Sequence, residues 1–153
     1  MGNNVVIREG VLSDLDAIMH VENTCFKIYG FSRRQLRNLL TAPTSKVFIA
    51  MLSGKVIGFG VTLINSPRNG QTKGRIYSIA VLPEHEHQGY GQLLSSHMQA
   101  YLYLMSVAYI TAECDAGNQR LIKRTTLAGY RITGRLEGYY ADGPDALRWR
   151  KDL

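Results

Sequence analysis

Two glycines, Gly89 and Gly91, flank Tyr90 between an apolar run and a helical pattern. Glycine has no side chain to block the close approach of phosphate oxygens, and it takes backbone angles that other residues resist. A turn between a strand and a helix also directs backbone N–H groups and the positive end of the helix dipole at an anion. Ordinary turns use glycine as well. Because a strand precedes this pair and a helix follows it, we expect the turn to bind an anion, and a pyrophosphate is the first candidate.

The best candidate for a general base is Glu113, which ends the segment YITAE five residues before Asn118. A carboxylate in a partly apolar cleft can accept a proton from an attacking group, directly or through a water molecule. Side chains alternate along a strand, so Glu113 and Cys114 should lie on opposite faces. In the alternative interpretation, Glu113 simply pairs with an arginine. Cys114 has no histidine near it in the sequence to activate it, so nothing in the pattern requires a covalent nucleophile.

The sequence predicts neither a metal site nor a disulfide. His85 and His87 are separated by one residue, but two histidines alone rarely hold a metal ion, and the anion turn already accounts for this segment. Cys25 and Cys114 form neither a metal pair at ligand spacing nor a disulfide framework. We therefore expect two reduced, partly buried thiols.

The elements that must position these residues follow from hydrophobic periodicity and turn signals. Ser13 has the position of an N-cap for the first helix, and Ser32 and Gln35 have capping-box spacing for the second. We expect strands at residues 5–7, 47–52, 56–64, 75–82, 109–114, 130–140 and 146–149, and helices at 14–26, from 32 to before Pro43, at 89–106 and at 118–128. This order predicts an α+β class with a mixed sheet, in which the unit 75–114 is parallel and right-handed.

Composition narrows the class of protein. The chain has 153 residues, of which 45% are hydrophobic, and this suits one domain over residues 1–153 with a single core. No apolar run is long enough for a membrane span and the N-terminus lacks a secretory signal, so we expect a cytoplasmic protein without a membrane partner. The net charge of +6 favours anionic partners. The basic residues are dispersed, however, so specific nucleic-acid binding is not expected.

The segment SIAVLPEHEHQGYGQLL is similar to the acetyl-coenzyme-A signature of the GCN5-related N-acetyltransferases, or GNAT superfamily. In that family an I-x-V strand leads into a Q/R-x-x-G-x-G/A turn. Here the strand is Ile79-Ala80-Val81, and the turn runs from Glu86 to Gly91. Glu86 departs from the pattern, because the family has Gln or Arg there. A carboxylate would repel a polyanion, so we expect the Glu86 side chain to face solvent.

The C-terminal half resembles the branch that acetylates the N-terminal alanine of a ribosomal protein. Asn118 precedes Gly129-Tyr130 by eleven residues, as an asparagine precedes a Gly-Phe pair in that branch. A Tyr-Tyr pair, Tyr139-Tyr140, also precedes a D-G-x-x-D-A-like turn at residues 142–146. The likeness covers nearly the whole chain.

The resemblance implies a fold and an acetyl donor. The fold would be a single GNAT domain with a mostly antiparallel, splayed central sheet flanked by about four helices. Acetyl-coenzyme A (acetyl-CoA) would be the donor, with no metal. The backbone of the I-x-V strand would pair with its pantetheine arm, and one strand N–H would stabilise the developing oxyanion. The implied cofactor-binding residues are Ile79, Ala80, Val81, His87, Gln88, Gly89, Tyr90, Gly91, Gln92 and Asn118.

The resemblance also implies catalytic roles. The acceptor amine would attack directly, with Glu113 as general base. Related enzymes place a tyrosine seven residues after the asparagine as general acid, and here that position is Thr125. An alcohol is a much weaker acid than a phenol, but a thiolate leaves without much help. The acid is therefore Thr125 with slower transfer, or a tyrosine: Tyr130, Tyr139 or Tyr140. The last two would line the acceptor side, or else pack at a strand end.

For the acceptor, the resemblance points first to a protein or peptide N-terminal α-amine. The sequence leaves two alternatives open. The first is an acetyltransferase for a small amine or a lysine side chain. The second is a non-catalytic acyl-CoA-binding module, which the replacement of the tyrosine by Thr125 keeps open.

Overall fold

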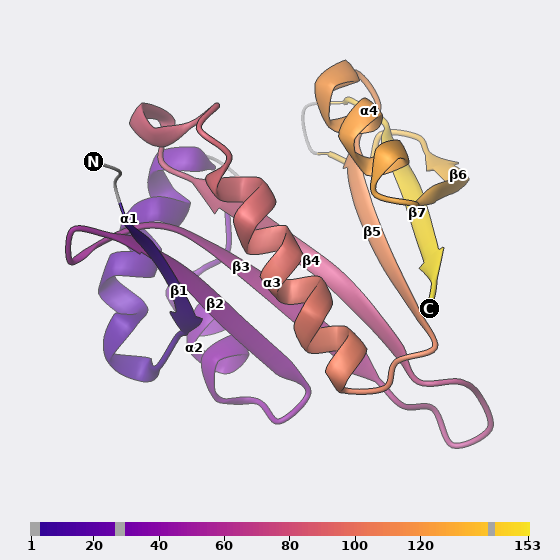
Figure 1. Ribbon diagram of the computed structural model, residues 1–153, viewed down its shortest axis with the longest axis horizontal. Coiled ribbons are helices and arrows are strands. Elements are labelled where there is room, and N and C mark those ends of the chain that lie inside the picture. The colour runs from indigo at the N-terminus through magenta and orange to yellow at the C-terminus, as the bar shows by residue number, and fades with distance from the viewer. Residues whose placement is uncertain (1–3, 27–29, 141–142) are drawn as a thin grey trace.

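The computed structural model describes residues 4–26, 30–140 and 143–153, and Figure 1 shows the arrangement of its elements. The order of strands and helices is the one expected from the sequence, and the α+β class is confirmed. The strands are β1 (Val5–Glu9), β2 (Ser45–Leu52), β3 (Lys55–Asn65), β4 (Lys73–Val81), β5 (Tyr109–Asp115), β6 (Arg131–Leu136) and β7 (Ala146–Asp152). The helices are α1 (Leu15–Cys25), α2 (Arg33–Thr41), α3 (Tyr90–Leu104) and α4 (Gln119–Leu127), with short 3₁₀ turns at Leu12–Asp14 and Pro83–His85.

The sheet has the strand order β1-β2-β3-β4-β5-β7-β6 and is antiparallel except between β4 and β5. The parallel pairing extends only from Lys73 and Tyr109 to Ile76 and Ala112. Beyond these residues the two strands separate, so the predicted splay is present. At the level where β4 separates from β5, the register of β4 against β3 shifts by one residue. Tyr77 is the extra residue of this β-bulge.

Two hydrophobic clusters lie on either side of the splay. The larger joins α1, α2 and α3 to strands β2–β4, and the smaller joins the end of α3 to β5, β7 and Tyr130. Helix α3 crosses the front of the sheet in Figure 1, and it approaches β3 closely because Gly60 has no side chain. A Cβ at Gly60 would stand 2.4 Å from the sulfur of Met98. The close seat of α3 fixes where its N-terminus meets the end of β4.

The structure corrects two local expectations. Ser13 is not the N-cap of α1, because it lies inside the 3₁₀ turn and Asp14 occupies the cap position. The Asp14 carboxylate accepts from the backbone N–H of Val11 at 2.8 Å and pairs with Arg8, and these contacts hold the turn in place.

The strand expected at 130–140 is also shorter, since β6 ends at Leu136. Gly138 then adopts a φ of +59°, and its N–H donates to Asp145 at 2.9 Å. Of the turn expected at 142–146, Asp142 lies outside the described residues. Within the described ranges, none of the helices is both long and apolar enough to cross a membrane.

Candidate active site

The unpaired edge of β4 is the first part of the site. The N–H of Leu82 donates to the carbonyl of Ile57 on β3 at 2.8 Å. Backbone polar groups alternate sides along a strand, so Ala80 also faces β3, whereas Ile79 and Val81 face the opposite edge. Because β5 has already separated from β4 at this level, the N–H groups of Ile79 and Val81 open onto the gap between the strands. The carbonyl of Val81 accepts from the Cys25 thiol at 3.3 Å.

The turn after β4 uses its two glycines in different ways. Gly89 is the N-cap position of α3 and has a φ of +88°, in the left-handed region that favours glycine. Gly91 lies inside α3, so the expectation that both glycines supply unusual backbone angles is wrong for this position. It matters instead by its size, because a Cβ there would stand 3.9 Å from Val81 and 4.0 Å from Ile79. These are ordinary contact distances, so a side chain here would lie against the end of β4, where Gly91 lines both cavities.

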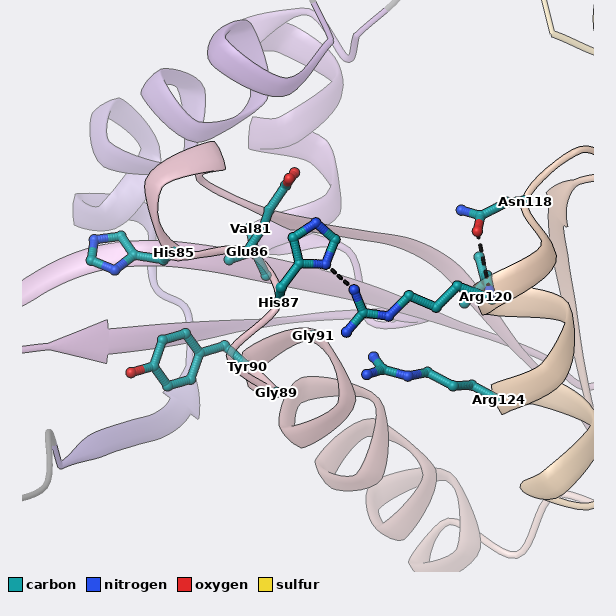
Figure 2. Close-up of a pocket in the computed structure, with 11 residues that line it drawn as sticks. Val81, His85, Glu86, His87, Gly89, Tyr90, Gly91, Asn118, Arg120 and Arg124 are labelled. Atoms are coloured by element: carbon teal, nitrogen blue, oxygen red, sulfur yellow. Dashed lines mark hydrogen bonds between the residues drawn. The ribbon is translucent and has the colours of Figure 1, made fainter.

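This turn lines a cavity of about 310 Å³, whose other wall is the start of α4. Figure 2 shows Arg120 and Arg124 reaching from α4 toward the turn, with Arg120 in contact with Nδ1 of His87. Glu86 is exposed, as expected, and its carboxylate points away from the space between the turn and the two guanidinium groups. Two cations therefore face backbone that can donate hydrogen bonds, which is a favourable environment for a polyanion.

A second cavity, of about 380 Å³, adjoins the first and shares Gly91, Leu121 and Arg124 with it. It lies in the gap between β4 and β5, under α3 and α4. Its walls also include Ile76, Tyr77, Ser78, Ile79, Gln92, Ala112, Glu113, Cys114, Thr125, Tyr130 and Trp149. The two cavities run from the turn between β4 and α3 to the point where β4 and β5 separate.

Glu113 stands at that point, with 7% of its side chain exposed. Its Oε1 pairs with Nη2 of Arg75, so the arginine partner that the sequence left open is present. Its Oε2 lies 3.8 Å from Nε of Arg148, too far for a hydrogen bond. Arg75 also donates to the hydroxyl of Tyr139 at 3.2 Å, and its guanidinium lies 4.6 Å from the ring centre of Tyr77. One carboxylate oxygen is thus fixed while the other remains available.

Charge and burial set the pKa values of Arg75 and of the Cys114 thiol. Burial is the largest influence on Arg75 and by itself lowers its pKa, but the charge and hydrogen bond of Glu113, together with those of Tyr139, outweigh burial and leave the pKa of Arg75 raised. The guanidinium therefore stays charged beside the carboxylate. Cys114 lies on the opposite face of β5, as predicted, where its sulfur accepts from Nε1 of Trp149 at 3.1 Å. Burial raises the pKa of the Cys114 thiol, which makes it a poor nucleophile.

The candidate proton donors lie in different environments. Tyr139 is half exposed beside Arg75, and its ring meets that of Tyr140 edge-on at 5.1 Å. Burial raises the pKa of Tyr140 to about 12, and it raises the pKa of Tyr130 further still. The hydroxyl of Thr125 donates to the carbonyl of Leu121 at 2.7 Å, within α4. Of these groups, Tyr139 is the one in direct contact with the Arg75–Glu113 pair.

The sequence-derived cofactor residues gather around the two cavities with some exceptions. Asn118 caps α4, since its side chain accepts from the N–H of Leu121 at 3.1 Å, and it also lines the first cavity. Ala80 and Gln88 line neither cavity. Sequence reasoning missed Arg75 and Arg120. Both are ordinary basic residues in the sequence, and only the register of β4 against β5 and the approach of α4 to the turn give them a role.

A known protein is similar to this chain over most of its length. The chain is 26% identical over 151 residues to the N-terminal acetyltransferase A complex catalytic subunit NAA10 of Arabidopsis thaliana, covering 97% of this chain and 78% of that protein.

Solved structures share the fold. The ribosomal-protein-S18-alanine N-acetyltransferase of Escherichia coli superposes with a TM-score of 0.84 at 22% identity, over 98% of this chain and 94% of that one. Arabidopsis thaliana Naa50 in complex with the bisubstrate analogue CoA-Ac-MVNAL superposes with a TM-score of 0.81 at 18% identity, over 97% of this chain and 99% of that one. The sequence profile of the acetyltransferase (GNAT) family matches residues 15–130, which is most of the chain. The protein therefore belongs to the GNAT family and is an N-acetyltransferase.

Proposed function

We propose that this enzyme transfers the acetyl group of acetyl-CoA to the α-amine of a protein or peptide N-terminus. The observation that carries the proposal is the separation of β4 from β5 after Ile76 and Ala112. Among the described residues, it leaves the N–H groups of Ile79 and Val81 without a strand partner, beside the same gap that Glu113 lines. The α-amine as acceptor is supported by the catalytic subunit NAA10 and by the peptide-linked analogue bound to Naa50.

The residues of the first cavity fit a CoA phosphate group. Arg120 and Arg124 would neutralise its charge, and the backbone N–H groups of His87–Gln92 at the start of α3 would donate to its oxygens. The unpaired N–H groups of Ile79 and Val81 would pair with the pantetheine amides, as an added strand would. When bound, acetyl-CoA supplies the activated acetyl group as a thioester.

The chain's own residues then handle two protons and one developing charge. Oε2 of Glu113 accepts the proton that the amine loses as its nitrogen bonds to the acetyl carbon. Arg75 fixes the other carboxylate oxygen, and thereby orients the base. An unpaired strand N–H donates to the carbonyl oxygen as it becomes negative. When the carbon–sulfur bond breaks, Tyr139 donates a proton to the departing sulfur.

The test measures thiol release from acetyl-CoA with a panel of acceptors. The panel contains peptides with a free N-terminus and no lysine, the same peptides with a blocked N-terminus and one internal lysine, and small primary amines. We expect release with the first group only, and mass spectrometry should place the acetyl group on the α-amine. The Glu113→Gln variant should lower kcat about 100-fold or more, since it cannot accept the proton.

The alternatives predict different results. Release with the blocked, lysine-bearing peptides or with the small amines would replace the α-amine by another acceptor. Saturable CoA binding without release on any amine would identify a non-catalytic module.

A further inference from the structure

The acceptor side of the site continues into a basic face of the sheet. Registered pairs place Lys73, Tyr109 and Asp152 in one row across β4, β5 and β7, and Arg75, Thr111, Arg150 and Arg131 in the next. Glu113 and Arg148 form the third row. We call this the basic sheet face, and its members are Lys73, Arg75, Arg131, Arg148, Arg150, Glu113, Asp152, Tyr109 and Thr111.

The side chains confirm that these rows share one face. Arg150 lies over the ring of Tyr109, with its guanidinium carbon 3.7 Å from the ring centre. Arg150 and Arg131 both pair with Asp152, at 2.8 Å and 3.4 Å. The intervening residues, such as Ile110 and Trp149, point into the smaller hydrophobic cluster on the other face. The five cations and two carboxylates of the basic sheet face give it a net charge of +3.

This face is open to solvent in the part of the chain that the structure describes. Helices α1 and α2 pack on β2, β3 and β4 and, among the described residues, leave β5, β7 and β6 uncovered. Helix α4 lies in front of the β5–β7 half in Figure 1, on the side of the smaller hydrophobic cluster and opposite to the basic sheet face. Arg131, Arg148 and Asp152 are exposed, and Arg150 is half-buried. A charged, accessible surface that begins at the proposed base and runs along β5 can guide the chain of an acceptor.

From this placement we infer that the basic sheet face binds an acidic segment of the acceptor polypeptide, a few residues after its N-terminus. The inference rests on the proposed function, since it assumes that the α-amine lies at Glu113. Thr111 and Arg150 lie one row from Glu113, which is about 7 Å along the strand. An extended acceptor covers that distance in about two residues, so its third to fifth residues would lie over Arg150 and Arg131. Carboxylates there would complement the positive charge of the face.

The experiment compares three peptides that share their first two residues and differ at residues three to five, which are all Glu, all Gln or all Lys. For the wild-type enzyme we expect kcat/KM to be at least about 10-fold higher with Glu than with Gln, through a lower KM, and lowest with Lys. The preference should shrink as ionic strength rises. In the double variant Arg131→Gln/Arg150→Gln, the ratio of Glu to Gln peptides should fall to about one. The variant Arg37→Gln/Lys55→Gln removes the same charge from α2 and from the first residue of β3, and it should keep the ratio.

Direct binding separates this inference from the proposed function. Fluorescence anisotropy of labelled peptides with CoA present should show the same order, Glu before Gln before Lys, even if none of them is acetylated. Equal use and equal binding of the three peptides would overturn the inference and leave the proposed function intact. Single-stranded RNA that displaces the Glu peptide, and that binds more tightly than the peptide in a manner dependent on Arg131 and Arg150, would overturn it by assigning the face to nucleic acid.

Discussion

The two oxygens of Glu113 are not equivalent, and this bears on its proposed role as a base. Oε1 is held by Arg75, while Oε2 lies 3.8 Å from Nε of Arg148. In the alternative interpretation, the ion pair makes Glu113 a structural residue. Here the pair orients the group and leaves one oxygen free for a proton, so the two interpretations that the sequence offered are compatible.

Tyr139 is expected to donate the proton to the leaving thiolate, because its hydroxyl contacts the Arg75–Glu113 pair at 3.2 Å through Arg75. The Tyr139→Phe variant should lower kcat by about 10- to 100-fold, at the lower end of the range for acid catalysis because a thiolate already leaves well. Steady-state kinetics with acetyl-CoA and a peptide would measure this. Tyr103→Phe, on the exposed surface of α3, is the matched control and should keep wild-type kcat.

Thr125→Tyr distinguishes the remaining choice of acid. The Thr125 hydroxyl already donates to Leu121, so it has little to offer as an acid. Because Tyr139 is the proposed acid, a phenol added at this position should leave kcat close to the wild-type value. Should Tyr139→Phe leave kcat unchanged while Thr125→Tyr raises it, the acid would belong to the α4 side of the gap.

At the scale of elements, the turn between β4 and α3 contains a glycine in the left-handed region, Gly89, with open space beside it. Gly89→Ala places a side chain at a φ of +88°, which should cost roughly 1 kcal/mol of unfolding free energy. Gly54→Ala, at a φ of +77° in the β2–β3 turn, imposes the same strain, and neither position has an atom within 4 Å of the added Cβ. Urea denaturation should therefore show similar losses for the two variants.

Only the variant in the β4–α3 turn should affect CoA. Isothermal titration should give a several-fold weaker Kd for Gly89→Ala and a wild-type Kd for Gly54→Ala. Equal CoA affinity in both variants would mean that the turn does not hold the phosphates.

The contact between α1 and the start of α2 contains a buried acid. Glu22 is 2% exposed and accepts from the N–H of Phe31 at 2.5 Å, while its Oε1 lacks a hydrogen-bond partner among the described residues. Burial raises the pKa of Glu22, and the hydrogen bond from Phe31 opposes this only in part. A raised folded-state pKa contributes stability below the unfolded pKa of about 4.3, and this contribution is lost as pH rises through the folded value.

Glu22→Gln should therefore gain stability relative to the wild type as pH rises from about 4 to about 8, by on the order of 1 kcal/mol. The neutral amide keeps an acceptor for Phe31 without the cost of a buried charge. Thermal denaturation of both proteins across this range would test the prediction. Parallel stability curves would show that Glu22 does not titrate differently in the folded state.

At the scale of the whole molecule, the order of elements and the glycine turn between β4 and α3 could be predicted from the sequence because both depend on local signals. Periodicity, capping residues and the Gly89/Gly91 spacing are contiguous features. The prediction of Ser13 as an N-cap is wrong, because the Asp14 carboxylate bonds to Arg8 and to the N–H of Val11. These contacts hold Ser13 inside the 3₁₀ turn. The bulge at Tyr77, the Arg75–Glu113 pair and the approach of Arg120 to His87 depend on register and on helix placement. These features are set by packing between segments that are distant in the sequence, so no local pattern predicts them.

The splay of the sheet leaves the backbone amides of β4 alternately directed at β3 and at the gap, and this difference can be measured. The N–H groups of Ala80 and Leu82 are directed at β3, whereas those of Ile79 and Val81 open onto the gap. If the pantetheine arm pairs with β4 as an added strand, CoA should slow amide exchange of Ile79 and Val81 by about 10-fold or more, and that of Ala80 and Leu82 much less. Exchange followed residue by residue by NMR, with and without CoA, measures this. Uniform protection of all four amides would indicate general stabilisation by ligand binding and would argue against strand-like pairing.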